Sequence, residues 1–171
     1  TVTSGEYKAS EALESAFARA IYTYNSKYSL TTTIRSDRSS KFAEGHQTGY
    51  FPSFAVSWRL SNEPFFANAK KIADNIKFRI GYGEVGNQGV PNYLYGAALN
   101  TFPTGLGTGF AIDKIPNLLL TWETAIQKDL GLDFSLLNNR IDASFDYFDK
   151  TSKNFIFQTP LPAFLLGQIA N

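Results

Sequence analysis

The sequence has 171 residues, with 16 Lys and Arg against 15 Asp and Glu, and its formal net charge is +1. This balance argues against a protein that binds nucleic acid, or that attaches to a membrane mainly through charge. Cysteine and methionine are both absent, which excludes a disulfide framework and a thiolate metal site. No run approaches the roughly 18 apolar residues of a transmembrane helix. The first residues lack the basic and apolar stretches of a signal peptide, so we expect a mature chain or a piece of a longer one.

The first third of the chain contains three segments in which apolar and polar residues alternate. Residues 16–24 and 28–35 are separated by a short turn at 25–27, and residues 50–60 follow a polar loop at 37–48. Side chains alternate between the two faces of a β-strand, so each segment predicts a strand with one apolar and one polar face.

The middle of the chain changes character twice. Pro64 follows Asn62 and Glu63 and favours the opening of one short helix, in a connection over residues 61–75. Residues 76–83 return to a strand pattern. Residues 84–119 are rich in Gly, Pro and Asn and have no sustained periodicity, which predicts a long loop.

A long hairpin is predicted over residues 120–150. Its first arm alternates for roughly 16 residues, beyond the usual globular strand of about 5–6. Asn138 and Asn139 separate the arms, and because Asn tolerates positive φ, the pair predicts a tight two-residue reversal. Long two-faced strands with a tight turn at one end are what a membrane-spanning β-barrel requires.

The connections and the aromatic residues support this interpretation. In an up-and-down meander the alternate connections share one end, so the long ones gather at the other, as in outer-membrane barrels. Aromatic residues near the short-turn end predict an interfacial girdle. They are Tyr22, Tyr24, Tyr28, Trp58 and Phe134. Lys128 is the one charge on the apolar face of its arm, about ten residues from the turn, where a lysine can reach the far interface.

Candidate chemical sites are weak. Gly81, Gly83 and Gly86 have the spacing of a dinucleotide-binding fingerprint, but the residues after them break a helix instead of starting one. His46 is the only histidine and lies in a polar loop. We therefore expect no catalytic residue, no cofactor-binding residue, no metal site and no enzyme activity.

Four acids fall on the polar faces of neighbouring strands, Asp129, Asp133, Asp142 and Asp146. They could be imagined as paired carboxylates. The favoured interpretation is a wet surface that they share with Arg140, Lys77 and Arg79.

The long loop offers one candidate binding surface. Its aromatic and amide residues could stack on and hydrogen-bond a carbohydrate or a peptide, or they could simply hold the loop in place. These candidate ligand-binding residues are Asn92, Tyr93, Tyr95, Phe102 and Phe110.

Several stretches resemble the SusC/RagA family of TonB-dependent outer-membrane transporters of Bacteroidetes-type bacteria. The resemblance covers about residues 15–162, in order and with the expected spacings. Its most specific motifs are Y-N-S-K-Y-S-L-T-T-T-I-R, G-Y-F-P-S-F-A-V-S-W-R-L-S, I-K-F-R-I-G-Y-G-E-V-G-N-Q, L-T-W-E-T, G-L-D-F-S-L-L-N-N-R-I and D-Y-F-D-K-T.

The resemblance implies a 22-stranded barrel with an internal plug, energised through the TonB complex. It also implies a SusD-like surface lipoprotein as a lid, and oligosaccharides or peptides as cargo. Nothing in the chain resembles the plug, the TonB-box segment or the closing strands of the family. About six strands are visible, whereas a bacterial single-chain barrel needs about eight or more.

We therefore expect an all-β chain whose antiparallel up-and-down strands form part of a transmembrane barrel, with one short periplasmic helix and a long extracellular loop. Residues 1–171 would be one partial barrel domain in the outer membrane of a Gram-negative bacterium, in contact with lipid and lipopolysaccharide. The apolar residues of three strands should face lipid. They are Phe54, Val56, Trp58, Ile76, Phe78, Ile80, Leu130, Leu132 and Phe134. The alternative is a soluble or periplasmic β-sheet ligand-binding domain, with its apolar face covered by protein.

Overall fold

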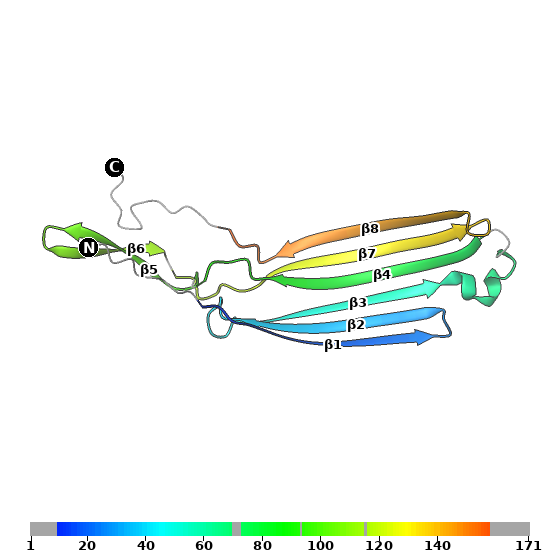
Figure 1. Ribbon diagram of the computed structural model, residues 1–171, viewed down its shortest axis with the longest axis horizontal. Helices are drawn as coiled ribbons and strands as arrows, with labels where there is room; N and C mark the ends of the chain where they lie inside the picture. Colours follow the sequence, from blue (N-terminus) through cyan, green and yellow to red (C-terminus); the bar gives the residue numbers. More distant parts are fainter. Residues whose placement is uncertain (1–9, 70–72, 93, 115, 158–171) are drawn as a thin grey trace.

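The computed structural model describes residues 10–69, 73–92, 94–114 and 116–157. Six long antiparallel strands form one sheet in the order β1-β2-β3-β4-β7-β8 (Figure 1). The strands are β1 (Leu13–Tyr24), β2 (Tyr28–Ser39), β3 (Thr48–Arg59), β4 (Ala73–Asn87), β7 (Glu123–Leu136) and β8 (Ile141–Lys153). Each strand of this sheet pairs with the strand of the same sheet that follows it in the sequence. The six predicted strands and their up-and-down order are therefore confirmed.

A second, two-stranded sheet lies within the long connection between β4 and β7. Strands β5 (Ala98–Thr104) and β6 (Gly107–Lys114) form a hairpin that projects from the long-loop end of the main sheet (Figure 1). The prediction of a loop without regular structure is wrong here. Glycine and proline interrupt the alternation of this segment, and the hairpin closes through Gly107, whose φ is +124°.

Residues 60–69, the described part of the connection between β3 and β4, contain helical turns in place of one short helix. Turns η1 (Leu60–Asn62) and η2 (Pro64–Phe66) are single 3-10 turns, and Pro64 stands at the start of the second, as its preset φ favours. Ala73, which falls within the predicted connection 61–75, already begins β4. No helix in the described part of the chain is long and apolar enough to cross a membrane.

The reversal between β7 and β8 takes four residues, where two were predicted. Leu137, Asn138 and Asn139 all have φ near +57°, and the backbone N–H of Arg140 donates to the carbonyl of Leu136 at 3.1 Å. The N–H of Asn139 donates to the Asp74 carboxylate at 2.9 Å. The two asparagines accept the left-handed conformation as expected, and Leu137 adopts it although its side chain disfavours it.

The register is continuous through the centre of the sheet, so side chains of one parity share a face across all six strands. Such residues form rows at right angles to the strands. One row runs Tyr22, Leu30, Val56, Ile80, Leu130 and Tyr147. The next row toward the short turns runs Tyr24, Tyr28, Trp58, Phe78, Leu132 and Phe145. The sheet therefore has one apolar face and one polar face, as the alternation predicts.

Candidate functional site

The apolar face is exposed although it is hydrophobic. Phe54 is 45% exposed, Ile80 44% and Leu130 41%, and no second layer of described elements covers them. A soluble domain of this size would bury such a face, because each large apolar side chain gains about 1.5–3 kcal/mol on leaving water. The nine residues predicted to face lipid all lie on this face.

The apolar band is inclined to the rows of paired residues. On β2 the band runs from Tyr28 to Ile34, and on β8 it runs from Ile141 to Tyr147. Tyr28 and Phe145 lie in the same row, so the band on β8 is displaced by four residues toward the short-turn end. Four strand-to-strand steps separate β2 from β8, so the band shifts by about 14 Å along the strands over about 19 Å across them. The inclination is about 35°, close to the strand tilt of roughly 35–45° in membrane barrels.

Charges on the apolar face lie only beyond the edges of this inclined band. Glu84 on β4, Lys128 on β7 and Asp149 on β8 come directly after Tyr82, Leu130 and Tyr147 of the band toward the long-loop end, and on β7 the buried Ile126 lies beyond Lys128. Within the band, the apolar-face positions of the six strands carry no charged residue. Lys128 therefore stands where a long cationic side chain can reach water.

On β2 and β3 an aromatic pair closes the band at the short-turn end. The rings of Tyr28 and Trp58 are stacked, with centroids 6.3 Å apart. The Glu63 carboxylate, in the connection between η1 and η2, accepts hydrogen bonds from the Tyr28 hydroxyl at 2.6 Å and from the Trp58 indole at 3.1 Å. Lys27 adds an ion pair to the same carboxylate at 3.0 Å. Glu63 thus satisfies the polar ends of two girdle aromatics and joins two neighbouring turns.

These contacts perturb the Glu63 carboxylate. Hydrogen bonds from Tyr28, Lys27 and Trp58 stabilise its charged form and lower its pKa from 4.5 to about 2. Sequence analysis missed Glu63, because its partners come from two other turns and strands and only the fold brings them together.

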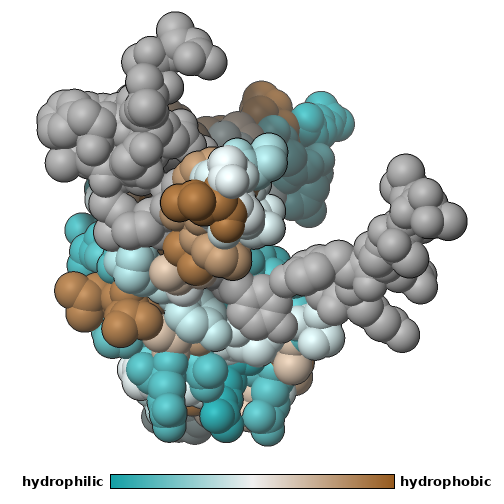
Figure 2. All heavy atoms as spheres, turned by 90° about the vertical axis from the view of Figure 1, so that its left-hand side faces the viewer, coloured by the Kyte–Doolittle hydropathy of each residue, from teal (hydrophilic) through white to brown (hydrophobic). Residues whose placement is uncertain are grey.

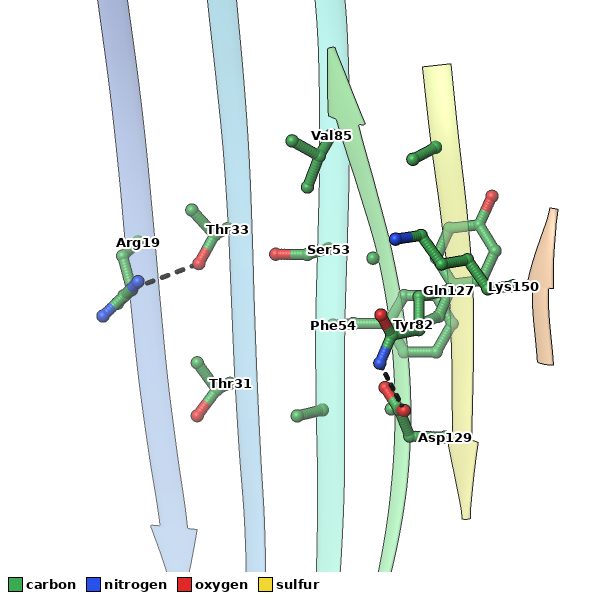
Figure 3. Close-up of a pocket in the computed structure, with 14 residues that line it drawn as sticks. Arg19, Thr31, Thr33, Ser53, Phe54, Tyr82, Val85, Gln127, Asp129 and Lys150 are labelled. Carbon is green, nitrogen blue, oxygen red and sulfur yellow. Dashed lines mark hydrogen bonds between the residues drawn. The ribbon is translucent and has the colours of Figure 1, made fainter. Parts of the chain in front are cut away.

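The polar face is shallowly hollowed at its centre. A cavity of about 580 Å³ is floored by small residues that include Ser53, Ala55, Gly81 and Gly83. Longer polar side chains stand around it (Figure 3), among them Arg19, Gln127, Asp129 and Lys150. Arg19 donates to the Thr33 hydroxyl at 3.2 Å, and Gln127 donates to Asp129 at 2.8 Å.

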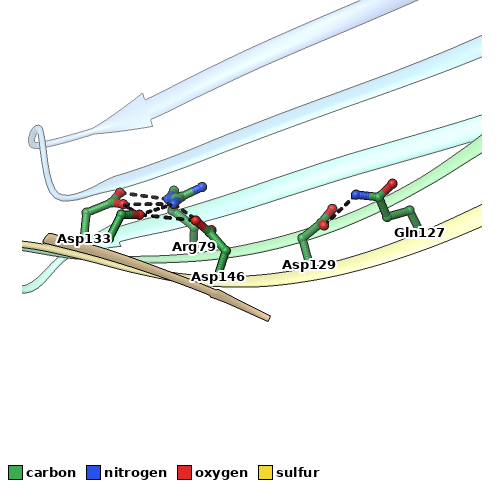
Figure 4. Close-up of polar contacts among 6 residues, drawn as sticks. Arg79, Gln127, Asp129, Asp133 and Asp146 are labelled. Atoms are coloured by element: carbon green, nitrogen blue, oxygen red, sulfur yellow. Dashed lines mark hydrogen bonds and ion pairs between the residues drawn. The ribbon is translucent and has the colours of Figure 1, made fainter. Parts of the chain in front are cut away.

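A charged cluster crosses three strands beside this hollow (Figure 4). The Arg79 guanidinium on β4 donates to both carboxylate oxygens of Asp133 on β7, at 2.8 and 2.9 Å, and to Asp146 on β8 at 2.9 Å. The Ser144 hydroxyl donates to Asp133 at 2.8 Å. Two of the four predicted acids thus neutralise an arginine, which supports a wet surface over paired catalytic carboxylates. Asp129 and Asp142 make no ion pair among the described residues.

The long-loop end is organised around Trp122. Its ring packs against Phe42 and Phe51, with centroids 5.2 and 5.5 Å away, and its indole N–H donates to the carbonyl of Gln47 at 3.0 Å. Val90 and Leu120 complete this buried cluster. Trp122 falls within the predicted hairpin over residues 120–150, but in the structure it precedes β7 and is 4% exposed.

The structure separates the predicted loop-binding residues into two groups. Tyr95 packs against the Trp122 cluster, and the Asn92 side-chain oxygen is buried without a hydrogen-bond partner among the described residues. Phe102 and Phe110 lie on the β5–β6 hairpin, 45% and 66% exposed. Phe102 pairs with Gly109 and Phe110 with Thr101, so the two rings point to opposite faces of the hairpin. Tyr93 lies outside the described residues.

Hydrophobic groups at this end are dispersed. Figure 2 looks at the long-loop end and shows separate hydrophobic patches among hydrophilic side chains. Leu106, at the tip of the β5–β6 hairpin, is fully exposed. Among the described residues no group of three or more metal-ligating side chains occurs. Residues 81–86 lie inside β4, so the glycine spacing there belongs to a strand.

Comparison with known proteins identifies the family. The family model described as "TonB dependent receptor-like, beta-barrel" matches residues 2–170. The chain is similar to TonB-dependent receptor P3 of Formosa agariphila, with 34% identity over all of this chain and 18% of the relative. It is 34% identical to TonB-dependent receptor SusC of Bacteroides thetaiotaomicron, over 85% of this chain and 15% of SusC. The chain thus spans less than a fifth of these relatives.

A solved structure has the same fold. The structure of the RagAB peptide transporter superposes with a TM-score of 0.80 at 25% identity, over 91% of this chain and 17% of that chain. The same transporter in its "open-open" state gives the same TM-score. The named relatives are receptors and transporters and not enzymes, in keeping with the expectation from the sequence.

Proposed function

The chain belongs to the TonB-dependent receptor β-barrel family, and we propose that it forms a section of the wall of an outer-membrane transporter that takes up peptides or oligosaccharides. In this role the apolar face contacts lipid and the polar face lines the interior of the barrel. Six strands alone leave two unpaired sheet edges, which the hydrocarbon of a membrane does not tolerate. The remaining strands of the same barrel pair with β1 and β8.

The observation that carries this proposal is the inclined, uncharged apolar band. A band that is horizontal in the membrane requires strands tilted by about 35°, which is the geometry of a closed barrel. Packing on a soluble core does not require Glu84, Lys128 and Asp149 to lie beyond one inclined edge of the apolar band. The alternative of a soluble or periplasmic ligand-binding domain accounts for the two faces but not for this slope.

The lengths of the turns and loops support an orientation in the membrane. Short turns lie at the periplasmic end of bacterial barrels and long loops at the outer end. The four-residue turn 137–140, η1 and η2 are then periplasmic, and the Trp122 cluster and the β5–β6 hairpin are extracellular. The protein works in the outer membrane of a Gram-negative bacterium, in agreement with the source of its relatives.

Partners and cargo follow from the same assignment. A SusD-like lipoprotein covers the long-loop end, the TonB complex energises transport through other parts of the protein, and lipopolysaccharide surrounds the outer edge. The structurally similar RagAB is a peptide transporter, which favours peptides as cargo. The exposed ring of Phe110 and the residues Asn92, Tyr93, Tyr95 and Phe102 are the proposed cargo contacts, by stacking and hydrogen bonding.

Spin labels on the full-length protein in lipid bilayers test the wall assignment. Labels at Val56 and Ile80 should be relaxed mainly by oxygen, which concentrates in lipid, because both positions lie on the apolar face. Labels at Ala55 and Ser57, one residue away on the polar face, are the matched control and should not follow the lipid profile. Equal exposure of both pairs to a water-soluble relaxation agent would contradict the proposal and favour the soluble alternative.

Uptake tests the transport assignment. Cells that lack the transporter gene and carry it on a plasmid should regain growth on a peptide or an oligosaccharide as the limiting nutrient. Deleting the β5–β6 hairpin should reduce uptake while the barrel remains in the outer membrane. Growth that is independent of the gene on every tested peptide and oligosaccharide would reject this class of cargo.

A further inference from the structure

A groove about 450 Å³ in volume lies on the apolar face, at the edge of the band toward the long-loop end. It is lined by the rings of Phe54 on β3 and Tyr82 on β4, which are stacked with centroids 5.2 Å apart and 18° between their planes. Ile80, Leu130 and Tyr147 belong to one row across β4, β7 and β8 and complete the apolar lining. A groove of this size and lining suits a hydrocarbon chain.

Two opposite charges lie side by side at this groove. Lys128 on β7 pairs in register with Asp149 on β8, and both side chains line the groove and are exposed. Neither makes an ion pair within the described ranges of the chain. Because an exposed ion pair contributes little to stability, the two groups have little to lose by binding an external partner instead of each other.

Two other acids near Lys128 are engaged or face away. Glu84 lies diagonally across from Lys128 on β4, and its carboxylate accepts a hydrogen bond from the Tyr82 hydroxyl. Asp129 also borders the groove, but its side chain lies on the polar face of the sheet, where it accepts from Gln127 at 2.8 Å. The groove therefore offers a head group one amine and one carboxylate, with the Glu84 carboxylate nearby.

This arrangement of charges discriminates between lipid head groups. The Lys128 ammonium donates hydrogen bonds to phosphate oxygens, and the Asp149 carboxylate accepts hydrogen bonds from a primary ammonium group. A head group that carries only a phosphate leaves Asp149 unmatched. A head group that carries several phosphates is repelled by Asp149 and Glu84 together. A zwitterionic head group with one phosphate and one primary amine matches both charges.

The position of the two charges agrees with the depth of a lipid head group. Lys128 and Asp149 come directly after Leu130 and Tyr147 of the uncharged band, so they lie where the hydrocarbon layer ends and the head groups begin. A lipid whose head group reaches these charges lays its chain along the apolar lining of the groove. The long-loop end is the outer end in the orientation above, so the lipid belongs to the outer leaflet.

We propose that this groove holds one lipid of the outer leaflet, with an acyl chain against Phe54 and Tyr82, its phosphate on Lys128 and its primary amine on Asp149. This proposal rests on the wall assignment above, because only a groove on the lipid-facing side is open to the bilayer. It goes beyond contact with bulk lipid, since it assigns one class of head group to one place on the wall. Polyanionic lipid A is the competing occupant.

Native mass spectrometry of the full-length protein in detergent tests this. The protein is mixed with equal amounts of phosphatidylethanolamine, phosphatidylglycerol and lipid A. Phosphatidylglycerol is the matched control, because it keeps the phosphate and the acyl chains and lacks the amine. We expect the first lipid retained to be phosphatidylethanolamine, by roughly fivefold over each of the other two. Equal retention of the three lipids, or a preference for phosphatidylglycerol or lipid A, would overturn the proposal.

Charge variants locate the preference at the groove. D149N should lower the retention of phosphatidylethanolamine by roughly fivefold and should not lower that of phosphatidylglycerol, because only the contact with the amine is lost. K128Q should lower the retention of both lipids. D129N and K150Q make the same changes of charge one residue away, on the polar face, and should leave retention unchanged. Equal effects of D149N and D129N would overturn the proposal.

The spin label at Val56 separates this inference from the wall assignment. A protein whose Val56 label follows the lipid profile, but which retains the three lipids equally, rejects this inference and leaves the wall assignment intact. A Val56 label that does not follow the lipid profile rejects the wall assignment itself.

Discussion

Arg79 and Gly131 are direct cross-strand partners on the polar face, and the Arg79 guanidinium lies over the bare Cα of the glycine. A Cβ added at Gly131 would stand 2.8 Å from the Arg79 Cζ and 2.8 Å from an Asp146 carboxylate oxygen. The missing side chain is what lets Arg79 reach diagonally to Asp133 and across to Asp146. One glycine thus makes room for a charged cluster that spans three strands.

Gly131→Ala should break this cluster. The flexible guanidinium can move aside, so the cost is the lost hydrogen bonds and not a steric clash, and at partly exposed ion pairs this is about 1 kcal/mol. The control is Gly83→Ala on β4, whose new Cβ would meet only Ser53, at 3.7 Å. Urea unfolding of the barrel in lipid vesicles measures both, and an equal effect of the two variants would contradict the explanation.

Arg79→Gln should make the Gly131 substitution nearly neutral. Once the guanidinium is gone, the alanine has no ion pair left to displace, so the two changes should be strongly non-additive. A double-mutant cycle on unfolding free energies measures the coupling. Simple additivity would show that Gly131 acts on the backbone and not through Arg79.

Glu63→Gln should remove one source of the pH dependence of stability. The pKa of Glu63 is lowered in the folded protein from 4.5 to about 2, so its contribution is complete above about pH 4.5 and is lost as pH falls toward 2. The wild-type protein should therefore exceed the variant in stability at pH 7, and the two should converge between about pH 4.5 and 2. Unfolding midpoints at several pH values measure this, and a difference constant with pH would contradict it.

Trp122→Ala should loosen the long loops and leave the strands paired. Its ring contacts Phe42 and Phe51, and removal of such a buried ring costs about 3 kcal/mol or more. Hydrogen exchange should rise in residues 40–47 and 88–92 but not in the centres of β3 and β4. Trp122→Phe is the control: it keeps most of the packing and loses only the hydrogen bond to the Gln47 carbonyl.

Leu137→Asn should stabilise the turn between β7 and β8. Leu137 has φ of +57°, a conformation that costs a leucine about 1 kcal/mol and that asparagine tolerates. We expect a gain of about 0.5–1 kcal/mol in unfolding free energy. Arg140→Asn, in the same turn at a residue without positive φ, should show no such gain, and a gain there would point to a general effect of asparagine.

Much of the fold is predictable because alternation is a local property. The parity of Phe54, Val56 and Trp58 assigns them to one face before any partner strand is known. The β5–β6 hairpin is not predictable in this way, because Pro103, Gly105 and Gly109 interrupt its pattern. The number of residues in the turn after β7 is likewise set by how the two strands align, and two asparagines alone do not determine it.

The sequence alone determined that the chain has six long strands, each with an apolar and a polar face, because side chains alternate with a period of two. Only the tertiary structure decided the register, since that depends on pairing between residues far apart in the chain. The register places Gly131 beneath Arg79, brings Lys77 opposite Arg59 and inclines the apolar band by about 35° to the rows of paired residues. Long-range packing likewise buries Trp122 against Phe42 and Phe51, which no local pattern contains.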